Sequence, residues 1–242
     1  MIKKRIGLVG YGNYGRFAAR HLSGWFDVRI YDPAAGRKDL PGVLRAGIIL
    51  LAIPVASIGP FLKKAAGLLR PESLIVDLSS VKTKPLGLLT RKLKNPVIGV
   101  HTLFGPESAA NGLSGLPAVL TPGSADRASR LHVRRFLEKK LKLKVIEMSG
   151  GEHDRQMAWV QGLSHFVAKA LQNMAVPALP HKTASFEKFS EMSRILRHTT
   201  WPLFETIENQ NPWAAPVRKR FVAELARLER RLSGRGKKGS KR

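Results

Sequence analysis

Two side chains that could act on a substrate hydroxyl group come at the ends of apolar stretches of strand length. The stretch 96–101 ends at His101, and the stretch 73–80 ends at Ser80. A histidine can accept the proton of an alcohol near neutral pH while a hydride leaves the alcohol carbon. We therefore expect His101 to be a catalytic base, with its ring left exposed by the Gly-Pro turn that follows, and Ser80 to lie in the same site.

The polar neighbours of these two residues are candidates for substrate binding. Ser79 precedes Ser80, and Thr102 follows His101. Ligands in open parallel sheets bind outside the carboxyl ends of the strands, where both residues would lie. Two alternatives stay open, because the Ser79 hydroxyl could cap the following helix and the Thr102 hydroxyl could cap its own turn.

A glycine motif near the start of the chain is typical of a dinucleotide site. It has the spacing G-x-G-x-x-G and stands between an apolar strand, 5–10, and a helical pattern, 14–24. Such glycines allow a tight turn and let a pyrophosphate approach the helix N-terminus closely. An acidic residue closes the next strand, 27–32, where a carboxylate can accept hydrogen bonds from ribose hydroxyls. The cofactor-binding candidates are Gly10, Gly12, Asn13, Tyr14, Gly15, Asp32 and Pro54.

The charges beside this motif indicate which dinucleotide is bound. Asp32 would repel the 2′-phosphate of NADP, which favours NAD. Arg37 and Lys38 follow closely in the sequence and keep NADP possible.

Three further residues lie in a part of the chain with helical patterns. Arg194 occurs in a partly apolar helix, where a buried guanidinium needs an anion, and a carboxylate is its best geometric match. His165 is either a core residue or a substrate contact, and His153 stands at a helix start. Because roughly 18 Å of helix separates these two histidines, we expect no metal site.

The elements that position these residues predict an α/β fold. Continuous apolar strands alternate with helices, which favours a doubly wound parallel sheet covered on both faces. After residue 150 only helical patterns follow. We expect a dinucleotide-binding domain over 1–149, a smaller all-helical domain over 150–232 and a disordered basic tail over 233–242. The predicted strands cover 5–10, 27–32, 46–54, 73–80, 96–101, 116–122 and 144–149.

Composition limits the possible partners and location. There are 42 Lys and Arg against 17 Asp and Glu, a net charge of +25, and no cysteine. The cations lack interleaved aromatic residues, so we do not expect nucleic-acid binding. The positive charge would instead attract a small anionic substrate. The absence of cysteine, signal peptide and membrane span predicts a cytoplasmic protein.

The ordered motifs resemble the prephenate/arogenate dehydrogenase family of tyrosine biosynthesis. The resemblance rests on G-x-G-x-x-G at 10–15, DLSSVK at 77–82, HTLFGPES at 101–108, EHD at 152–154, GLSHF at 162–166 and MSRIL at 192–196.

This resemblance implies a Rossmann-type domain, a helical dimerisation domain, a homodimer and an NAD-dependent enzyme. The implied reaction is the oxidative decarboxylation of prephenate to 4-hydroxyphenylpyruvate. By the same resemblance His101 is the base at the ring hydroxyl and Ser80 positions that hydroxyl. Arg194 then binds a substrate carboxylate, and His165 lies near the substrate side chain.

Three alternatives remain at this point. Arogenate could be the substrate instead of prephenate, since acids of the helical part such as Glu152, Asp154 or Glu191 could recognise its ammonium group. A β-hydroxyacid or imine reductase would share the two-domain plan, with Lys169 as a candidate catalytic lysine. A non-catalytic dinucleotide-binding protein is the third reading.

Overall fold

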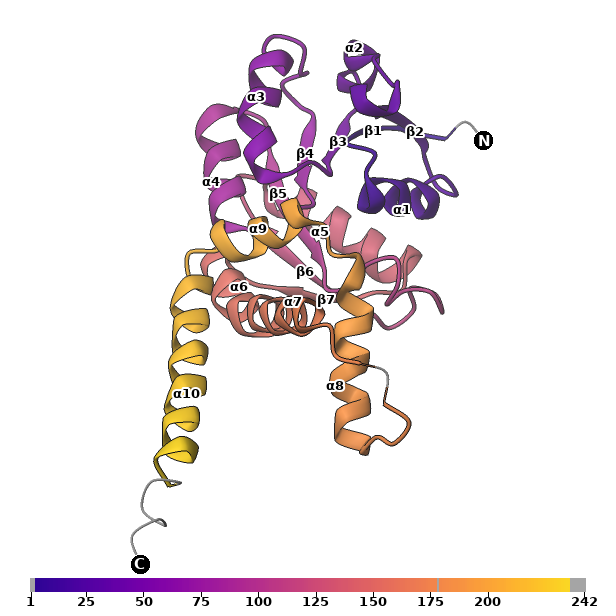
Figure 1. Cartoon of the computed structure of the whole chain (residues 1–242). Coiled ribbons are helices and arrows are strands. Elements are labelled where there is room, and N and C mark those ends of the chain that lie inside the picture. The colour runs from indigo at the N-terminus through magenta and orange to yellow at the C-terminus, as the bar shows by residue number, and fades with distance from the viewer. Residues whose placement is uncertain (1–2, 178, 236–242) are drawn as a thin grey trace, which may run out of the picture. The chain divides into compact units, whose positions relative to one another are not determined.

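The computed structural model describes residues 3–177 and 179–235 and divides the chain into two compact units (Figure 1). Unit 1 covers Met1–Asp154 and unit 2 covers Arg155–Arg242. The division therefore falls after Asp154, where the sequence suggests residue 149. Its position has a physical reason, because the side chains of His153 and Asp154 hydrogen-bond to residues of unit 1.

Unit 1 contains a seven-stranded sheet in the order β2-β1-β3-β4-β5-β6-β7. All seven predicted strands form, and the α/β fold class is confirmed. The strands are β1 Arg5–Val9, β2 Asp27–Tyr31, β3 Ile48–Leu51, β4 Leu74–Asp77, β5 Val97–Thr102, β6 Pro117–Pro122 and β7 Lys144–Glu147.

Two strands correct the expectation of a parallel sheet. Strands β1 to β5 pair in parallel, but β5 and β6 are antiparallel, and β7 is parallel to β6. The connection 103–116 between β5 and β6 has turns and no helix. A parallel neighbour needs a crossover connection, usually a helix, whereas an antiparallel neighbour can be reached by a loop.

Helices cover both faces of this sheet, which explains the continuous apolar strands. Ile6 and Leu8 of β1 pack in one cluster, with residues of α1 and the α5 segment, while Val9 packs in the opposite cluster with α2, α3 and α4. Successive strand residues point to opposite faces, so a strand covered on both sides is apolar throughout. The helices of unit 1 are α1 Asn13–Leu22, α2 Leu40–Leu44, α3 Val55–Ala65, α4 Thr83–Lys92, α5 Arg127–Arg135 and the first part of α6 Gly150–Met157, with a 3₁₀ turn η1 at Pro33–Ala35 and a π-helical segment η2 at Phe136–Lys140.

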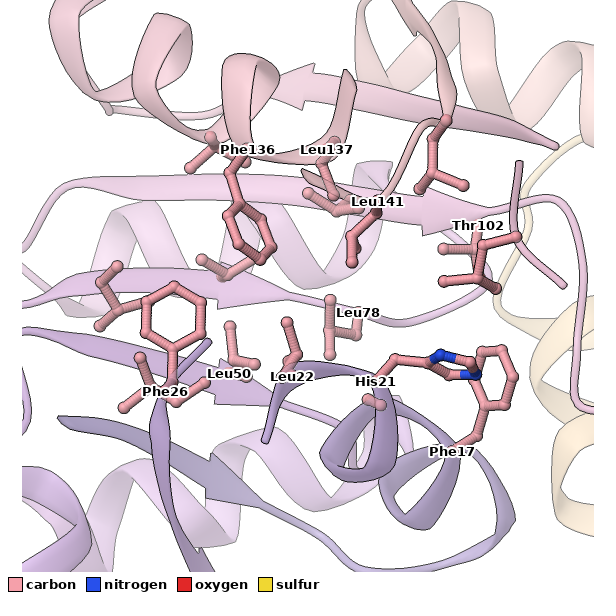
Figure 2. A pocket seen from close by; sticks show the side chains of 18 of the residues that line it. Phe17, His21, Leu22, Phe26, Leu50, Leu78, Thr102, Phe136, Leu137 and Leu141 are labelled. Carbon is pink, nitrogen blue, oxygen red and sulfur yellow. The ribbon is translucent and has the colours of Figure 1, made fainter. Parts of the chain in front are cut away.

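One face of the sheet keeps a cavity of about 120 Å³ between α1 and the α5–η2 segment (Figure 2). Side chains of the strands form its floor. Phe136 of η2 lies against Phe26 at one end, with ring centroids 5.2 Å apart, and Phe17 of α1 lies beside His21 at the other end, on the side of Thr102. Most of its lining is apolar, and the polar side chains among the lining residues are Tyr14, His21, Thr102 and His132.

Unit 2 is helical, as expected. A π-helical segment η3, Ala158–Leu163, joins α6 to α7 Ser164–Met174. The predicted helix over 186–210 is in fact two, α8 Ala184–Ile195 and α9 Trp201–Asn209, joined through a 3₁₀ turn η4 at Leu196–His198. Pro202 is the second residue of α9, where a proline is tolerated because the N–H groups of the first helical turn have no partner within the helix.

Helix α10 covers Ala214–Arg235 (Figure 1). The expected tail over 233–242 is therefore corrected at its start, which is still helical, and residues 236–242 lie outside the described part. Within residues 3–177 and 179–235, no helix combines the length and apolar character that crossing a bilayer requires.

Candidate active site

The glycine loop between β1 and α1 has the three separate glycine roles that a dinucleotide site needs. Gly10 has φ +97°, and a Cβ there would lie 2.3 Å from the Ala52 carbonyl oxygen. A Cβ on Gly15 would lie 2.3 Å from the Gly10 oxygen, so Gly15 allows the helix to pack on the loop. Gly12 has open space where its Cβ would be, at the N-cap of α1. A pyrophosphate can therefore approach the backbone at Gly12.

This loop lies at the topological switch point of the sheet. Strand β1 pairs with β2 on one side and β3 on the other, and the crevice beyond their carboxyl ends is where such sheets bind ligands. Asn13 is the first residue of α1, and Pro54 is the N-cap of α3 after β3. Both cofactor-binding candidates therefore begin helices at this edge of the sheet.

Asp32 follows β2 and is tied to the glycine loop. Its Oδ2 accepts a hydrogen bond of 2.7 Å from the Tyr11 N–H, and its Oδ1 accepts from the N–H groups of Ala34 and Ala35. The Arg37 guanidinium stacks over the Tyr11 ring at 4.8 Å. The carboxylate expected to meet the ribose thus also fixes the loop, and a cation stands beside it.

Tyr14 and Thr102 contact each other directly. The Thr102 hydroxyl donates to the Phe104 carbonyl oxygen at 3.0 Å, so the Tyr14 hydroxyl donates to Thr102 Oγ1 at 2.8 Å. Burial raises the pKa of Tyr14, and the Thr102 hydrogen bond opposes this effect. Both side chains line the apolar cavity. Of the two roles left open for Thr102, the structure gives the hydroxyl a capping bond in its own turn.

The turn after β4 holds Ser79 and Ser80 in different ways. The Ser79 hydroxyl lies 2.9 Å from Asp77 Oδ2 and 2.7 Å from the Val81 carbonyl oxygen, so it bonds within the turn. It does not cap α4, whose N-cap is Lys82. Ser80 is half-buried in the same turn. Lys82 is completely buried and donates to Asp77 Oδ2 at 2.5 Å and to the Ser79 carbonyl oxygen at 2.6 Å.

His101 lies in β5 at the same edge of the sheet. Asp77 is paired with Gly99 in the β4–β5 register, so His101 and Ser79 both lie two residues beyond that pair. The residue is only 6% exposed, which corrects the expectation of an imidazole left open to solvent. Its Nδ1 lies 2.8 Å from Nε2 of His153. A second histidine from α6, rather than solvent, faces this side of the ring.

The sequence placed His153 only at a helix start and offered Asp154 only as a possible contact for an ammonium group, and it predicted neither residue as a partner of His101. His153 Nδ1 lies 2.7 Å from Asp154 Oδ1, and Asp154 accepts hydrogen bonds from the N–H groups of Lys82 and Thr83. Burial raises the pKa of Asp154, but the hydrogen bonds from His153 and these backbone groups outweigh it, and the net pKa is lowered. The EHD motif was the available signal, although nothing in it indicates a partner 52 residues away.

Arg194 and His165 lie in unit 2. Arg194 is exposed and pairs with Glu191 at 3.5 Å on α8, so the expected buried guanidinium is not found. The ring of His165 is half-buried in α7, with Nδ1 2.8 Å from the Gln161 carbonyl oxygen. Burial lowers the pKa of His165, against the effect of that hydrogen bond. Over residues 3–177 and 179–235, no group of three or more His, Cys, Asp or Glu side chains could hold a metal ion.

Two family models match the chain in succession. The nucleotide-binding domain of prephenate dehydrogenase matches residues 29–147, and the dimerization domain of prephenate dehydrogenase matches residues 149–239. The matched ranges cover most of both units.

The relatives that this chain matches are named after different substrates. The chain is 26% identical over 252 residues to arogenate dehydrogenase 1, chloroplastic, of Arabidopsis thaliana, covering 96% of this chain but only 39% of that protein. It is 25% identical over 259 residues to cyclohexadienyl dehydrogenase of Zymomonas mobilis, covering 93% of this chain and 87% of that protein.

A solved structure has the same fold. Prephenate dehydrogenase from A. aeolicus, in complex with hydroxyphenyl propionate and NAD+, superimposes with a TM-score of 0.72 at 21% identity, covering 98% of this chain and 93% of that one.

Proposed function

The chain belongs to the prephenate dehydrogenase family, and on that basis we propose that it converts prephenate to 4-hydroxyphenylpyruvate by NAD-dependent oxidative decarboxylation. The observation that carries the proposal is the presence of an open glycine loop and a buried histidine at one edge of the sheet. A dinucleotide site beside a base is what oxidation of an alcohol needs.

The reaction can be divided among the residues of this edge. His101 accepts the proton of the ring hydroxyl, so the O–H bond breaks as an N–H bond forms. Ser80 lies in the neighbouring turn and orients that hydroxyl. A dinucleotide held at the glycine loop would supply the acceptor for the hydride that leaves the carbon bearing this hydroxyl. Loss of the ring carboxylate as carbon dioxide then leaves an aromatic ring, which favours the overall reaction.

The glycine loop and Asp32 would hold the cofactor. The backbone N–H groups at the start of α1 face an anion favourably, and Gly12 has no side chain in the way. Asp32 favours the free ribose hydroxyls of NAD. Arg37 lies next to Tyr11 and makes NADP the alternative to test.

Arg194 and His165 stay proposed contacts for a small anionic substrate, because their motifs match the family pattern. The exposed guanidinium of Arg194 pairs with Glu191 on its own helix and is able to bind a second anion. Arg194→Gln should raise the KM of the substrate several-fold and leave kcat nearly unchanged.

Steady-state assays with two substrates and two cofactors test the proposal. Prephenate and arogenate are each supplied with NAD and with NADP, and the product is identified. We expect the highest kcat/KM with prephenate and NAD. If the protein converts only arogenate, the proposed substrate is wrong and arogenate takes its place. If it converts neither compound, the proposed function is wrong.

A matched pair of variants tests His101. His101→Asn should lower kcat by about 100-fold or more without changing NAD affinity, because a base contributes that much to proton transfer. His181→Asn, on an exposed histidine of unit 2, should leave both values unchanged. An equal loss of NAD affinity and turnover in His101→Asn would contradict the assigned role.

We also propose that the protein is a cytoplasmic homodimer that associates through unit 2. The matched family domain is a dimerization domain, and this unit exposes several large apolar side chains on α10, among them Val222, Leu225 and Leu228. Light scattering should give twice the chain mass. Leu225→Glu should lower that mass, whereas Arg227→Glu on the same helix should not.

A further inference from the structure

We propose that His153 and Asp154 are positioning residues for catalysis: they set which nitrogen of His101 receives the substrate proton and stabilise the imidazolium that forms. The inference rests on the proposed function, in which His101 is the base. It is carried by the unbroken hydrogen-bond chain from His101 through His153 to Asp154.

The chain is anchored at Asp154. Its Oδ1 lies 2.7 Å from the N–H nitrogen of Lys82, and its Oδ2 lies 2.8 Å from that of Thr83. Thr83 is the first residue of α4, so the carboxylate sits at the positive end of a helix dipole. These hydrogen bonds keep Asp154 ionised and prevent it from rotating.

An ionised Asp154 determines both imidazole tautomers. A carboxylate only accepts, so His153 must carry its proton on Nδ1, which lies 2.7 Å from Asp154 Oδ1. The Nε2 atom of a neutral His153 is then an acceptor, and the nitrogen facing it at 2.8 Å, His101 Nδ1, must carry a proton. The tautomer assigned from this network gives His101 its lone pair on Nε2.

The same arrangement stabilises the product of proton transfer. When His101 Nε2 takes the hydroxyl proton, the Nδ1–H stays in place and donates to His153. The positive charge is then linked to the negative charge of Asp154 through the His153 ring. His153 and Asp154 are fully buried, so water screens this attraction little. No proton needs to leave Asp154 or His153 for the base to work.

A structural role for Asp154 is the competing explanation, because it also accepts hydrogen bonds at the start of α4. A matched control separates the two roles. Asp126 caps α5 in the same way, with Oδ1 accepting from the Ser129 N–H at 2.6 Å, and it belongs to no histidine chain. Asp154→Asn and Asp126→Asn both keep the shape and the accepting carbonyl oxygen.

Asp154→Asn should lower kcat by about 10²- to 10⁴-fold, the size of effect seen when a buried carboxylate that orients a catalytic histidine becomes an amide. Prephenate KM and NAD affinity should stay within a factor of about 3, because neither ligand loses a contact. Asp126→Asn should keep wild-type kcat. A wild-type kcat in a folded Asp154→Asn variant would overturn the proposal.

A second pair keeps the test independent of Asp154. His153→Gln offers an amide oxygen that can accept from His101 Nδ1, whereas His153→Leu offers none. We expect His153→Gln to keep at least about ten times the kcat of His153→Leu, at equal melting temperature within a few degrees. Equal activity of the two would overturn the proposal. Inactivity of the wild type toward both substrates would instead overturn the proposed function.

Discussion

The Nζ atom of Lys82 lies 2.5 Å from Oδ2 of Asp77, and both side chains are almost completely excluded from solvent (0% and 1% exposed). Burial lowers the pKa of Lys82, while the Asp77 carboxylate opposes this effect. Gly99 on the neighbouring strand makes room for the pair, since a Cβ there would lie 2.7 Å from Lys82 Cδ. A buried ion pair therefore fixes the turn that carries Ser79 and Ser80.

Removing one partner of this pair should destabilise the protein strongly. Lys82→Met leaves the Asp77 carboxylate buried without its cation, at a cost of about 3–5 kcal/mol in the free energy of unfolding. Urea unfolding measures this cost. The double variant Lys82→Met/Asp77→Leu removes both charges and should cost less than the sum of the two single changes.

A solvent-accessible ion pair gives the control for that measurement. Arg134 pairs with Glu138 at 2.9 Å across one turn of helix, and the two side chains are 39% and 31% exposed. Arg134→Met should change the free energy of unfolding by at most about 1 kcal/mol. A similar small effect for Lys82→Met would show that the buried pair does not hold the turn.

The second prediction concerns the glycine loop, where we expect alanine substitutions at Gly12 and Gly15 to have different effects on melting temperature and NAD affinity. Gly15→Ala should lower the melting temperature clearly, because its Cβ would lie 2.3 Å from the Gly10 carbonyl oxygen. Gly12→Ala meets no protein atom within 4 Å and should leave the melting temperature unchanged. Its methyl group would instead occupy the approach of a pyrophosphate, so the Kd of NAD should rise about 10-fold or more.

Calorimetry on the two variants distinguishes these outcomes. Loss of NAD affinity only in Gly15→Ala, with Gly12→Ala like the wild type, would mean that the dinucleotide does not bind at this loop.

Local sequence patterns were sufficient for the sheet and the glycine loop. All four residues of β3 and residues 74–76 of β4 are apolar because both faces of the sheet are covered, and this pattern depends only on short segments. Gly10 and Gly15 are likewise constrained by atoms a few residues away or on the adjacent strand. Such features repeat in many sheets and are readable from spacing.

The parts that the sequence did not predict depend on distant residues. The partner of His101 is His153, which belongs to α6. Strand β6 runs antiparallel to β5, and the segment 103–116 that connects them is a loop of turns rather than a helix. For Arg194 the prediction was wrong, because the partly apolar pattern of its helix indicated a buried guanidinium and the side chain is exposed. Periodicity gives the face of a helix, but not what covers it.

The cavity on the α1 face makes a third prediction. Ala18 lines it, and Ala18→Leu would place additional carbon atoms in the empty space of about 120 Å³. Because empty core volume costs stability, the variant should gain about 1 kcal/mol in the free energy of unfolding. Ala128→Leu, at an exposed position of α5, adds the same atoms outside the cavity and should change stability by less than about 0.5 kcal/mol.

A loss of stability in Ala18→Leu would contradict this account of the cavity. It would show that the walls at α1 and η2 cannot accept the larger side chain without displacement.

Glu208 in α9 makes the last prediction, which concerns pH. The residue is 4% exposed, and its Oε2 pairs with Arg218. Its Oε1 has no hydrogen-bond partner within the described part of the chain. Burial raises the pKa of Glu208, and the Arg218 guanidinium only partly offsets this effect. Ionisation of Glu208 is therefore less favourable in the folded state than in the unfolded chain.

The sign of the pH dependence follows from that raised pKa. Below about pH 4 the carboxyl is protonated in both states, so its ionisation has no effect on folding. As the pH rises through the unfolded value toward the folded one, the wild type loses stability relative to Glu208→Gln, which cannot ionise. Urea unfolding at pH 4 and pH 8 should show the variant gaining on the wild type at the higher pH. Glu205→Gln changes an exposed position of the same helix and is the control. Its difference from the wild type in the free energy of unfolding should be the same at both pH values. An equally constant difference for Glu208→Gln would show that burial does not disfavour the ionised carboxyl.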